Sequence, residues 1–327
     1  MSNQDSIKVI IQIPCFNEEQ TLPITLADLP SHIDGVDIIE TLIIDDGSTD
    51  KTLEVARAAG VDHIVRNKRN MGLARSFRRG IEAALALGAD IIVNTDGDNQ
   101  YVGEDVALLV GPILSGRAEI VIGDRQTHLI EHFSPLKKVL QWVGSAIVRR
   151  LAGIAVPDTV SGFRAFSREA AIKLNIVSGY SYTIETVIQA GKRDMAVESV
   201  PVRTNGELRK SRLFTSTPMF IQRQVSTILR MYAMYQPLKV FFYVGMGFTV
   251  IGMLPICRFL YFYFTDGGAG NIQSLLLGSV LLIMGFIAFV AGLVTDLIAA
   301  NRQLLEMTLE RVKRMEIENA VAKPPRQ

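Results

Sequence analysis

The stretch IIVNTDGDNQ, residues 91–100, decides the fold of this chain because an apolar run ends directly in an acidic loop. A run as short as Ile91-Ile92-Val93, between a helical stretch and a polar loop, is typical of a strand buried on both faces. Asp96 and Asp98 follow that strand one residue apart, so we expect them to point the same way and to share a hard cation, Mg²⁺ or Mn²⁺. Such a cation bridges the two phosphates of a nucleotide and neutralises a leaving diphosphate.

Two different roles for this pair of aspartates fit the sequence less well. An EF-hand loop needs Gly at its sixth position and Glu at its twelfth, where this chain has Tyr101 and Ala107. A plain acidic turn that caps a helix would explain the pair only if no other polar cluster followed a neighbouring strand.

Strands and helices alternate on both sides of this stretch. The patterns predict strands at 9–13, 38–44, 63–65, 120–122 and 196–202, and helices at 53–59, 72–87, 104–114 and 137–151. Alternation of this kind is typical of a parallel, doubly wound α/β sheet, which binds ligands at the carboxyl ends of its strands.

Two further polar clusters stand at such strand ends, at residues 14–19 (PCFNEE) and 45–48 (DDGS). Phe16 offers an aromatic wall for a nucleoside, and Glu18 and Asp46 offer acceptors for its base and ribose. No G-x-G-x-x-G follows the first strand, which disfavours a dinucleotide-dependent dehydrogenase, and no G-K-[ST] phosphate loop occurs.

The bulk composition excludes several classes of protein. The chain has 327 residues and a net charge of +1, which argues against nucleic acid as a partner. Cys15 and Cys257 are too few and too far apart for a disulfide framework or a zinc site. The N-terminal segment is polar and its apolar run 9–14 is too short for a secretory signal, so we expect the first part of the chain to stay in the cytoplasm.

The C-terminal part predicts a membrane anchor. The apolar stretches 238–264 and 273–300 each exceed the ~20 residues that cross a bilayer. The linker between them has no Lys or Arg, unlike the outer flanks, so the positive-inside rule places both termini in the cytoplasm. We therefore expect an integral protein of the bacterial inner membrane or an equivalent membrane, with transmembrane helices within 237–301.

Two flanking helices complete this organisation. Residues 218–236 form an amphipathic pattern that we expect to lie in the membrane interface. The tail, residues 302–327, is predicted to be helical and cytoplasmic. It would pack on a partner subunit, giving a homo-oligomer, or simply extend the second span.

Six ordered motifs carry a resemblance to a known family. They are IPCFNEE (13–19), IDDGSTD (44–50), NMGLAR (70–75), DGDNQ (96–100), GDR (123–125) and DTVSGFRAF (158–166). The chain resembles an inverting family 2 glycosyltransferase of the GT-A fold, and within that family the dolichyl- or polyprenyl-phosphate sugar synthases. The resemblance runs from Ile11 to about Leu213, so residues 1–217 are expected to form the catalytic domain.

The resemblance implies a role for each matching residue. The nucleotide sugar would be held by Pro14, Phe16, Asn17, Glu18, Asp46, Asp96, Arg125 and Ser161. The metal would be faced by Asp96, Asp98 and the amide oxygen of Gln100, and Arg125 would contact phosphate. The acceptor phosphate would be held by Lys137 or Lys138 and by Arg164, Arg203, Arg209, Lys210 and Arg212. Ser161, Arg164 and Glu185 would shape the sugar and acceptor pocket.

Two departures from relatives bear on these roles. Gly97 and Asn99 flank the second aspartate where relatives commonly have Ala or Leu. The Q-x-x-R-W motif of processive polysaccharide synthases is absent, which favours transfer of a single sugar.

The predicted reaction moves one sugar from a UDP- or GDP-sugar to a polyprenyl phosphate with inversion, with Asp96, Asp98 and Arg125 stabilising the leaving group. A phosphate monoester, with a second pKa of about 6, is already largely dianionic and needs no base. A membrane lipid hydroxyl is an alternative acceptor and would need one, with Glu185 or Asp158 as the candidates. A non-catalytic nucleotide-sugar-binding scaffold is the second alternative.

Overall fold

The structure is a computed structural model, and it describes residues 6–126, 135–177, 182–206, 226, 235–266 and 271–322. The chain divides into two compact units. The first, here called the catalytic unit, comprises residues 1–221 and 310–327, and the second, the hairpin unit, comprises residues 222–309. The predicted interface helix 218–236 falls almost entirely outside the described residues.

A seven-stranded sheet forms the centre of the catalytic unit, in the order β3-β2-β1-β4-β6-β5-β7. The strands are β1 (Lys8–Cys15), β2 (Ile38–Asp45), β3 (His63–Arg66), β4 (Ile91–Asn94), β5 (Ile120–Asp124), β6 (Arg164–Ser167) and β7 (Val197–Pro201). Only β6 runs antiparallel to its neighbours β4 and β5 among these strands. The predicted mostly parallel α/β sheet is confirmed, and β6 arises inside the DTVSGFRAF motif.

The strand register brings the predicted clusters to one edge. β1 pairs with β2 so that Cys15 lies opposite Asp45, and with β4 so that Gln12 lies opposite Asn94. The PCFNEE, DDGS and DGDNQ loops therefore leave the sheet at the same end, as expected for adjacent parallel strands.

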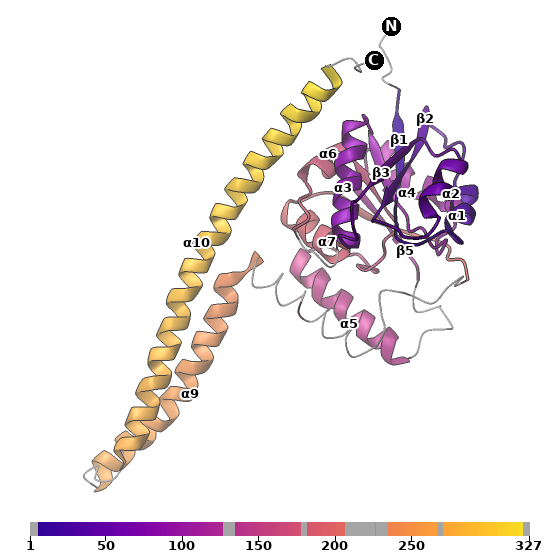
Figure 1. The fold of residues 1–327 in the computed structure, drawn as a ribbon. Coiled ribbons are helices and arrows are strands. Elements are labelled where there is room, and N and C mark those ends of the chain that lie inside the picture. The colour runs from indigo at the N-terminus through magenta and orange to yellow at the C-terminus, as the bar shows by residue number, and fades with distance from the viewer. Residues whose placement is uncertain are drawn as a thin grey trace. The chain divides into compact units, whose positions relative to one another are not determined.

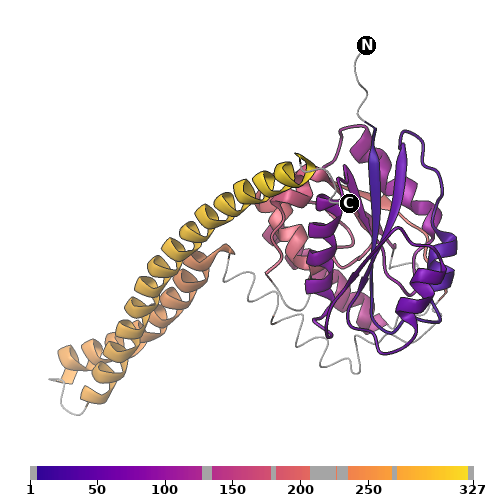
Figure 2. The same ribbon diagram turned by 45° about the horizontal axis from the view of Figure 1, so that its top comes forward.

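Helices cover both faces of the sheet (Figures 1 and 2). They are α1 (Leu22–Asp28), α2 (Thr52–Ala58), α3 (Leu73–Ala86), η1 (Gly103–Asp105), α4 (Val106–Leu114), α5 (Pro135–Ala152), α6 (Arg168–Lys173) and α7 (Tyr182–Lys192). On one face α1, α2 and α4 pack with Val9, Ile11 and Ile13 into one core cluster. On the other face α3 approaches so closely that a β-carbon on Gly80 would lie 2.3 Å from Gln12 Oε1. Burial on both faces explains why the strands read as continuous apolar runs.

The hairpin unit contains α9 (Pro237–Asp266) and most of α10 (Ile272–Ala322), both long and apolar enough to cross a membrane. The two helices touch through glycines seven residues apart. A β-carbon on Gly245 would lie 3.0 Å from the carbonyl oxygen of Gly285, and one on Gly252 would lie 3.1 Å from that of Gly278. Small residues of this kind let two helix backbones approach closely within a bilayer.

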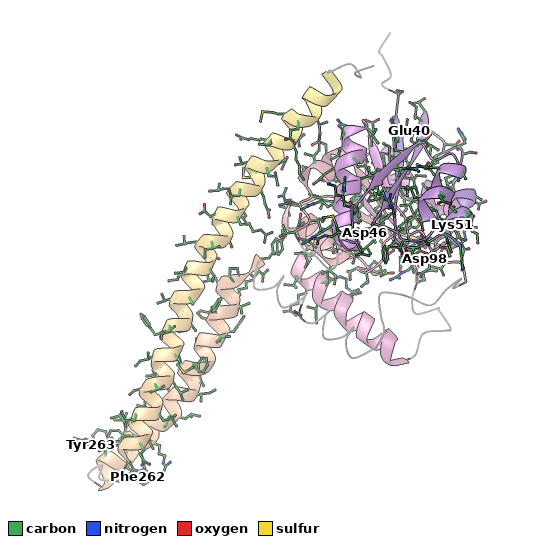
Figure 3. All side chains as sticks on the ribbon, viewed as in Figure 1. Glu40, Asp46, Lys51, Asp98, Phe262 and Tyr263 are labelled. Carbon is green, nitrogen blue, oxygen red and sulfur yellow. The ribbon has the colours of Figure 1, made fainter. Side chains whose placement is uncertain are left out.

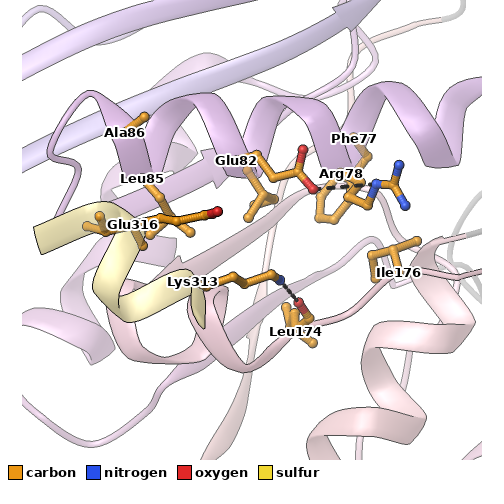
Figure 4. Close-up of a pocket in the computed structure, with 11 residues that line it drawn as sticks. Phe77, Arg78, Glu82, Leu85, Ala86, Leu174, Ile176, Lys313 and Glu316 are labelled. Carbon is orange, nitrogen blue, oxygen red and sulfur yellow. Dashed lines mark hydrogen bonds and ion pairs between the residues drawn. The ribbon is translucent and has the colours of Figure 1, made fainter. Parts of the chain in front are cut away.

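The end of α10 belongs to the catalytic unit and packs on it. Lys313 Nζ donates to the carbonyl oxygen of Leu174 at 2.9 Å, and Arg314 pairs with both carboxylate oxygens of Glu169 at 3.0 and 2.6 Å. A cavity of about 260 Å³ lies between this segment and α3, with Phe77 and Ile317 in its wall (Figure 4). The end of α10 thus packs on the catalytic unit of the same chain. The sequence led us to expect either a partner subunit or a simple extension of the second span.

Candidate active site

The two carboxylates of the predicted metal site stand directly after β4. Asp96 and Asp98 are both half-buried, and Gln100 Nε2 donates to Asp98 Oδ2 at 2.9 Å. Gln100 therefore holds Asp98 in place through its amide nitrogen. Figure 3 places Asp98 and Asp46 at the same end of the sheet, with Glu40 toward the other end.

Gly97 lies close to the side chain of Cys15. A β-carbon there would lie 2.9 Å from Cys15 Sγ, so the Ala or Leu of relatives would displace the thiol or the loop. Burial raises the pKa of the Cys15 thiol, and the charges of Glu18, Asp45, Asp96 and Asp98 raise it further. These four carboxylates thus concentrate negative charge at this edge, where a bound cation would be stabilised.

A divalent cation fits this edge if the substrate completes its coordination. Among the described residues, no group of three or more His, Cys, Asp or Glu side chains could hold a metal ion. Asp96 and Asp98 supply two hard oxygen ligands, and Mg²⁺ in proteins is often bound by one or two carboxylates together with substrate phosphates and waters. The donor set therefore suits a metal that arrives with a nucleotide diphosphate.

The PCFNEE loop is fastened to the loop after β2. Asn17, with φ 57°, accepts the Thr49 N–H at 2.8 Å and donates its own N–H to Ser48 Oγ at 2.9 Å. Thr21 Oγ1 lies 2.8 Å from both Glu18 Oε2 and the carbonyl oxygen of Gly97, so it connects this loop with the DGDNQ loop. Pro14 is buried at the end of β1 and Phe16 is exposed. The exposed Phe16 ring is therefore accessible, as the predicted wall of a nucleoside site requires.

The carboxylate of Asp46 is hydrogen-bonded to other residues of the protein. The residue is 4% exposed, and its carboxylate accepts hydrogen bonds from Asn67 Nδ2 and from the backbone N–H groups of Met71 and Gly72, at 2.7–2.9 Å. The structure therefore gives Asp46 the role of anchoring the segment that begins the NMGLAR motif, where the sequence analysis predicted direct contact with the nucleoside.

Asp158 and Arg125 form a buried bidentate ion pair. Arg125 Nε lies 2.7 Å from Asp158 Oδ2, and Nη2 lies 3.1 Å from Oδ1. Asp158 Oδ1 also accepts the N–H groups of Val160 and Ser161. Burial opposes ionisation, but the charge and hydrogen bonds of Arg125 lower the pKa of Asp158. The carboxylate fixes the following loop. Its lowered pKa makes it a weak base, and Arg125 and two backbone N–H groups already occupy its oxygens, which disfavours a role as general base.

Arg164 and Ser161 are both fully buried. The Arg164 guanidinium donates to the carbonyl oxygens of Thr159, Ser161 and Thr183 and to Thr186 Oγ1. Burial lowers the pKa of Arg164 to about 10. The predicted contact of Arg164 with an acceptor phosphate is wrong for this structure, because the guanidinium holds the 159–164 loop from inside.

The remaining acceptor-side predictions have different outcomes. Glu185 is fully buried and accepts the Val177 N–H at 3.1 Å, so it holds the segment before α7. Arg203 is exposed and pairs with Asp105 and Glu104. The side chains of Lys137 and Lys138 in α5, and the whole of Arg209, Lys210 and Arg212, lie outside what the structure describes.

The chain after β7 crosses the acidic loop. Asn205 N donates to the carbonyl oxygen of Gln100 at 2.9 Å, and Asn205 Nδ2 lies 3.2 Å from that of Asn99. Tyr101 and Thr204 form an isolated β-bridge. The predicted basic loop thus begins next to the loop that carries the predicted metal site. Sequence reasoning missed Asn205, because no pattern marks a contact between segments about 100 residues apart.

Solved structures with a similar fold identify the fold of the catalytic unit. Glucosyl-3-phosphoglycerate synthase from Mycobacterium tuberculosis, in a complex with UDP, superposes with a TM-score of 0.55 over 69% of this chain and 80% of that chain, at 23% identity. A complex of the same enzyme with Mn²⁺, UDP-glucose and phosphoglyceric acid gives 0.55 at 22% identity, over 69% of this chain and 79% of that chain. The fold is therefore GT-A, as predicted.

The family follows from the sequence comparison. The glycosyl transferase family 2 model matches residues 10–174, and the chain belongs to this family. A UDP-N-acetylglucosamine–dolichyl-phosphate N-acetylglucosaminyltransferase from Methanococcus voltae is 30% identical over 60% of this chain and 85% of that protein. An undecaprenyl-phosphate mannosyltransferase from Micrococcus luteus is 26% identical over 60% of this chain and 83% of that protein.

Proposed function

We propose that the protein transfers one sugar, with inversion, from a nucleotide sugar to a polyprenyl phosphate at the cytoplasmic face of a membrane. The observation that carries the proposal is the acidic edge formed by Asp96 and Asp98, with the start of the basic 203–212 segment fastened beside it by Asn205. The named relatives that act on dolichyl and undecaprenyl phosphate support the acceptor class. The two apolar helices support a location where such a lipid is available.

A divalent metal, Mg²⁺ or Mn²⁺, would be held by Asp96 and Asp98 and would neutralise the charge that develops on the departing diphosphate. Gln100 keeps Asp98 oriented through its hydrogen bond. Arg125, 17% exposed and held by Asp158, adds positive charge near the same edge. Phe16 covers the nucleoside, and the loops anchored by Asn17 and Asp46 shape the space around it.

The state of the buried carboxyl groups favours a phosphate acceptor over a lipid hydroxyl. A hydroxyl needs a general base within hydrogen-bond reach. Asp158 is ion-paired with Arg125, with a lowered pKa, and Glu185 is fully buried with the Val177 N–H on its carboxylate. A phosphate nucleophile needs neither group, because it is already largely dianionic near neutral pH.

The test is a transfer assay with the detergent-solubilised full chain, Mg²⁺ or Mn²⁺ and radiolabelled UDP- and GDP-sugars. Polyprenyl phosphate is the acceptor in one set of reactions, and a diacylglycerol, which offers a lipid hydroxyl, is the acceptor in a parallel set. We expect label to enter the organic phase as an acid-labile product and transfer to stop when EDTA is added. An acid-stable glycolipid would instead identify a hydroxyl acceptor. Nucleotide binding without transfer to either acceptor would indicate the scaffold.

Asp98→Asn tests the metal assignment within the same assay. We expect turnover to fall by more than about 100-fold, because even outer-sphere partners of a metal are worth about 10- to 100-fold. Asp34→Asn, an equal change at an exposed aspartate paired only with His32 among the contacts described, serves as the matched control. Wild-type turnover in Asp98→Asn would exclude the assigned metal site.

A further inference from the structure

The peptide groups of Gly162 are held from three sides. Its N–H donates to the hydroxyl of Tyr101 at 3.1 Å. Its carbonyl oxygen accepts from Asn94 Nδ2 at 2.9 Å and from the hydroxyl of Tyr182 at 3.4 Å. Asn94 Nδ2 also donates to the Tyr182 hydroxyl at 3.0 Å, so Asn94 and Tyr182 act on the carbonyl as one unit.

Both tyrosines are buried at fixed positions. Tyr182 is 1% exposed, and its ring stacks on Phe77 with the centroids 3.9 Å apart and the planes 8° apart. Tyr101 is 4% exposed and stacks on Phe163. A buried hydroxyl without a partner would destabilise the fold by about 1–3 kcal/mol. The hydroxyls are tolerated because they meet the Gly162 peptide, whereas a phenylalanine would pack equally well in the apolar part of either site.

The α-carbon of Gly162 lies directly against the Asp96 side chain. A β-carbon on Gly162 would lie 3.0 Å from Asp96 Oδ2, 3.3 Å from Asp96 Oδ1 and 2.9 Å from the Tyr182 hydroxyl oxygen. Of the two neighbours, Tyr182 is held by its stacked ring, so a methyl group at residue 162 would press on Asp96. The glycine therefore leaves the space that the Asp96 carboxylate occupies.

We propose that Tyr182 is a positioning residue for Asp96: with Asn94 it fixes the Gly162 peptide, whose bare α-carbon sets the orientation of the carboxylate that receives the metal–diphosphate group. The inference rests on the proposed function in assigning Asp96 to that group. Outer-sphere partners of metal ligands commonly contribute about 10- to 100-fold to metal affinity, and Tyr182 would act one step further out, through a backbone peptide.

The first test is Gly162→Ala in the full chain. The added methyl is expected to push Asp96 away, so Mn²⁺ binding in the presence of UDP or GDP, measured by electron paramagnetic resonance, should weaken by about 10-fold. The midpoint of thermal unfolding should also fall, because the methyl group overpacks a buried site, so binding is measured well below that midpoint. Gly111→Ala is the matched control, because Gly111 is exposed in α4 with open space around its would-be β-carbon.

The second test adds Tyr182→Phe. Alone, this change should weaken Mn²⁺ binding by no more than about 3-fold, because the longer of the two bonds to the Gly162 carbonyl is lost and Asn94 keeps the shorter one. In the double variant Gly162→Ala/Tyr182→Phe, the hydroxyl that blocks the methyl at 2.9 Å is gone. The methyl can then move off Asp96, and affinity should recover by about 3-fold or more relative to Gly162→Ala.

Recovery of Mn²⁺ affinity in the double variant would assign the loss in Gly162→Ala to the clash between residues 162 and 182, because residues in contact are coupled whereas unrelated destabilising changes add. Wild-type Mn²⁺ affinity in Gly162→Ala, or a double variant that binds as weakly as the product of the two single effects, would overturn the proposal. Failure of the proposed function has a different signature. The wild-type chain would then transfer no sugar, while the Mn²⁺ measurements would still rank the variants.

Discussion

Two bidentate arginine–carboxylate pairs hold different parts of the catalytic unit, one through Nε and Nη2 of Arg125 and the other through Nη1 and Nη2 of Arg314. Arg125 grips Asp158 beside the candidate site, with the side chains 17% and 2% exposed. Arg314 grips Glu169 where the end of α10 packs, with the side chains 35% and 53% exposed. Removing one partner of a buried pair leaves the other charge desolvated and without a counter-charge. When one partner of an exposed pair is removed, water replaces the lost contacts of the other. Burial, more than distance, should therefore decide what each pair contributes.

The two pairs also differ in what depends on them. Asp158 accepts hydrogen bonds from two backbone N–H groups of the loop that leads to Gly162. Its carboxylate therefore helps to hold the loop that lies against Asp96. Glu169 receives only Arg314 among its described hydrogen bonds, and the pair joins two helices that also meet through Lys313 and Leu174. Loss of the Arg125–Asp158 pair should therefore alter the candidate active site. Loss of the Arg314–Glu169 pair should affect only the contact between α10 and α6.

The largest effect on stability is expected for Arg125→Met, which leaves Asp158 buried and unpaired. The loss should be about 3–5 kcal/mol. At roughly 2–4 °C per kcal/mol for a unit of this size, the melting temperature should fall by about 10 °C. Thermal unfolding followed by tyrosine and tryptophan fluorescence measures it. Arg117→Met is the control, because Arg117 pairs with Glu198 in an exposed position. A shift below about 2 °C would show that the buried pair contributes little net stability.

The pH dependence of that loss sharpens the comparison. In the wild type the pKa of Asp158 is lowered, so its contribution is fully present above the unfolded value of about 3.9 and is lost as the pH falls through the lower folded value. In Arg125→Met, the main group that lowers the pKa of Asp158 is lost, and burial, which raises this pKa, is opposed by the Val160 hydrogen bond and the charge of Arg164. The carboxyl then becomes protonated at a higher pH than in the wild type, so the stability gap between variant and wild type should narrow as the pH falls from neutrality toward the unfolded value of about 3.9. A gap that widens over this range would contradict the burial argument.

The smallest effect is expected for Arg314→Met. Hydrogen bonds from Arg314 lower the pKa of Glu169, but exposed pairs contribute only about 0–1 kcal/mol. The melting temperature should change by no more than about 3 °C, and sugar transfer should stay at the wild-type level. A fall comparable with that of Arg125→Met would show that the tail supports the catalytic unit as strongly as the buried pair does.

The predictions from the sequence that succeeded concern features that depend on residues close together in the chain. The periodicity of apolar residues predicted every described strand of the sheet to within about two residues except β6, whose residues were noted only as a motif. β6 runs antiparallel between two other strands, a placement that depends on contacts far along the chain. The long apolar helices were also predicted, because hydrophobic length is a local property.

The roles of individual charged side chains were harder to predict. Arg164 and Asp46 stand in motifs that indicated ligand contact, yet their charges are used to hold the 159–164 loop and the 67–72 segment. The same residue types serve a ligand or the protein itself, and only the neighbours decide between the two. Tyr182, Asn94 and Asn205 carried no signal, because their partners are distant in sequence.

The sequence by itself determined the alternation of strands and helices, the edge at which the acidic loops gather and the two apolar helices, because each depends on residues close together in the chain. The tertiary structure decided which charges are buried, why residue 162 is a glycine and what the end of α10 contacts. Those properties depend on the space and the hydrogen-bond partners that remain when segments up to 145 residues apart meet, and no local pattern encodes them.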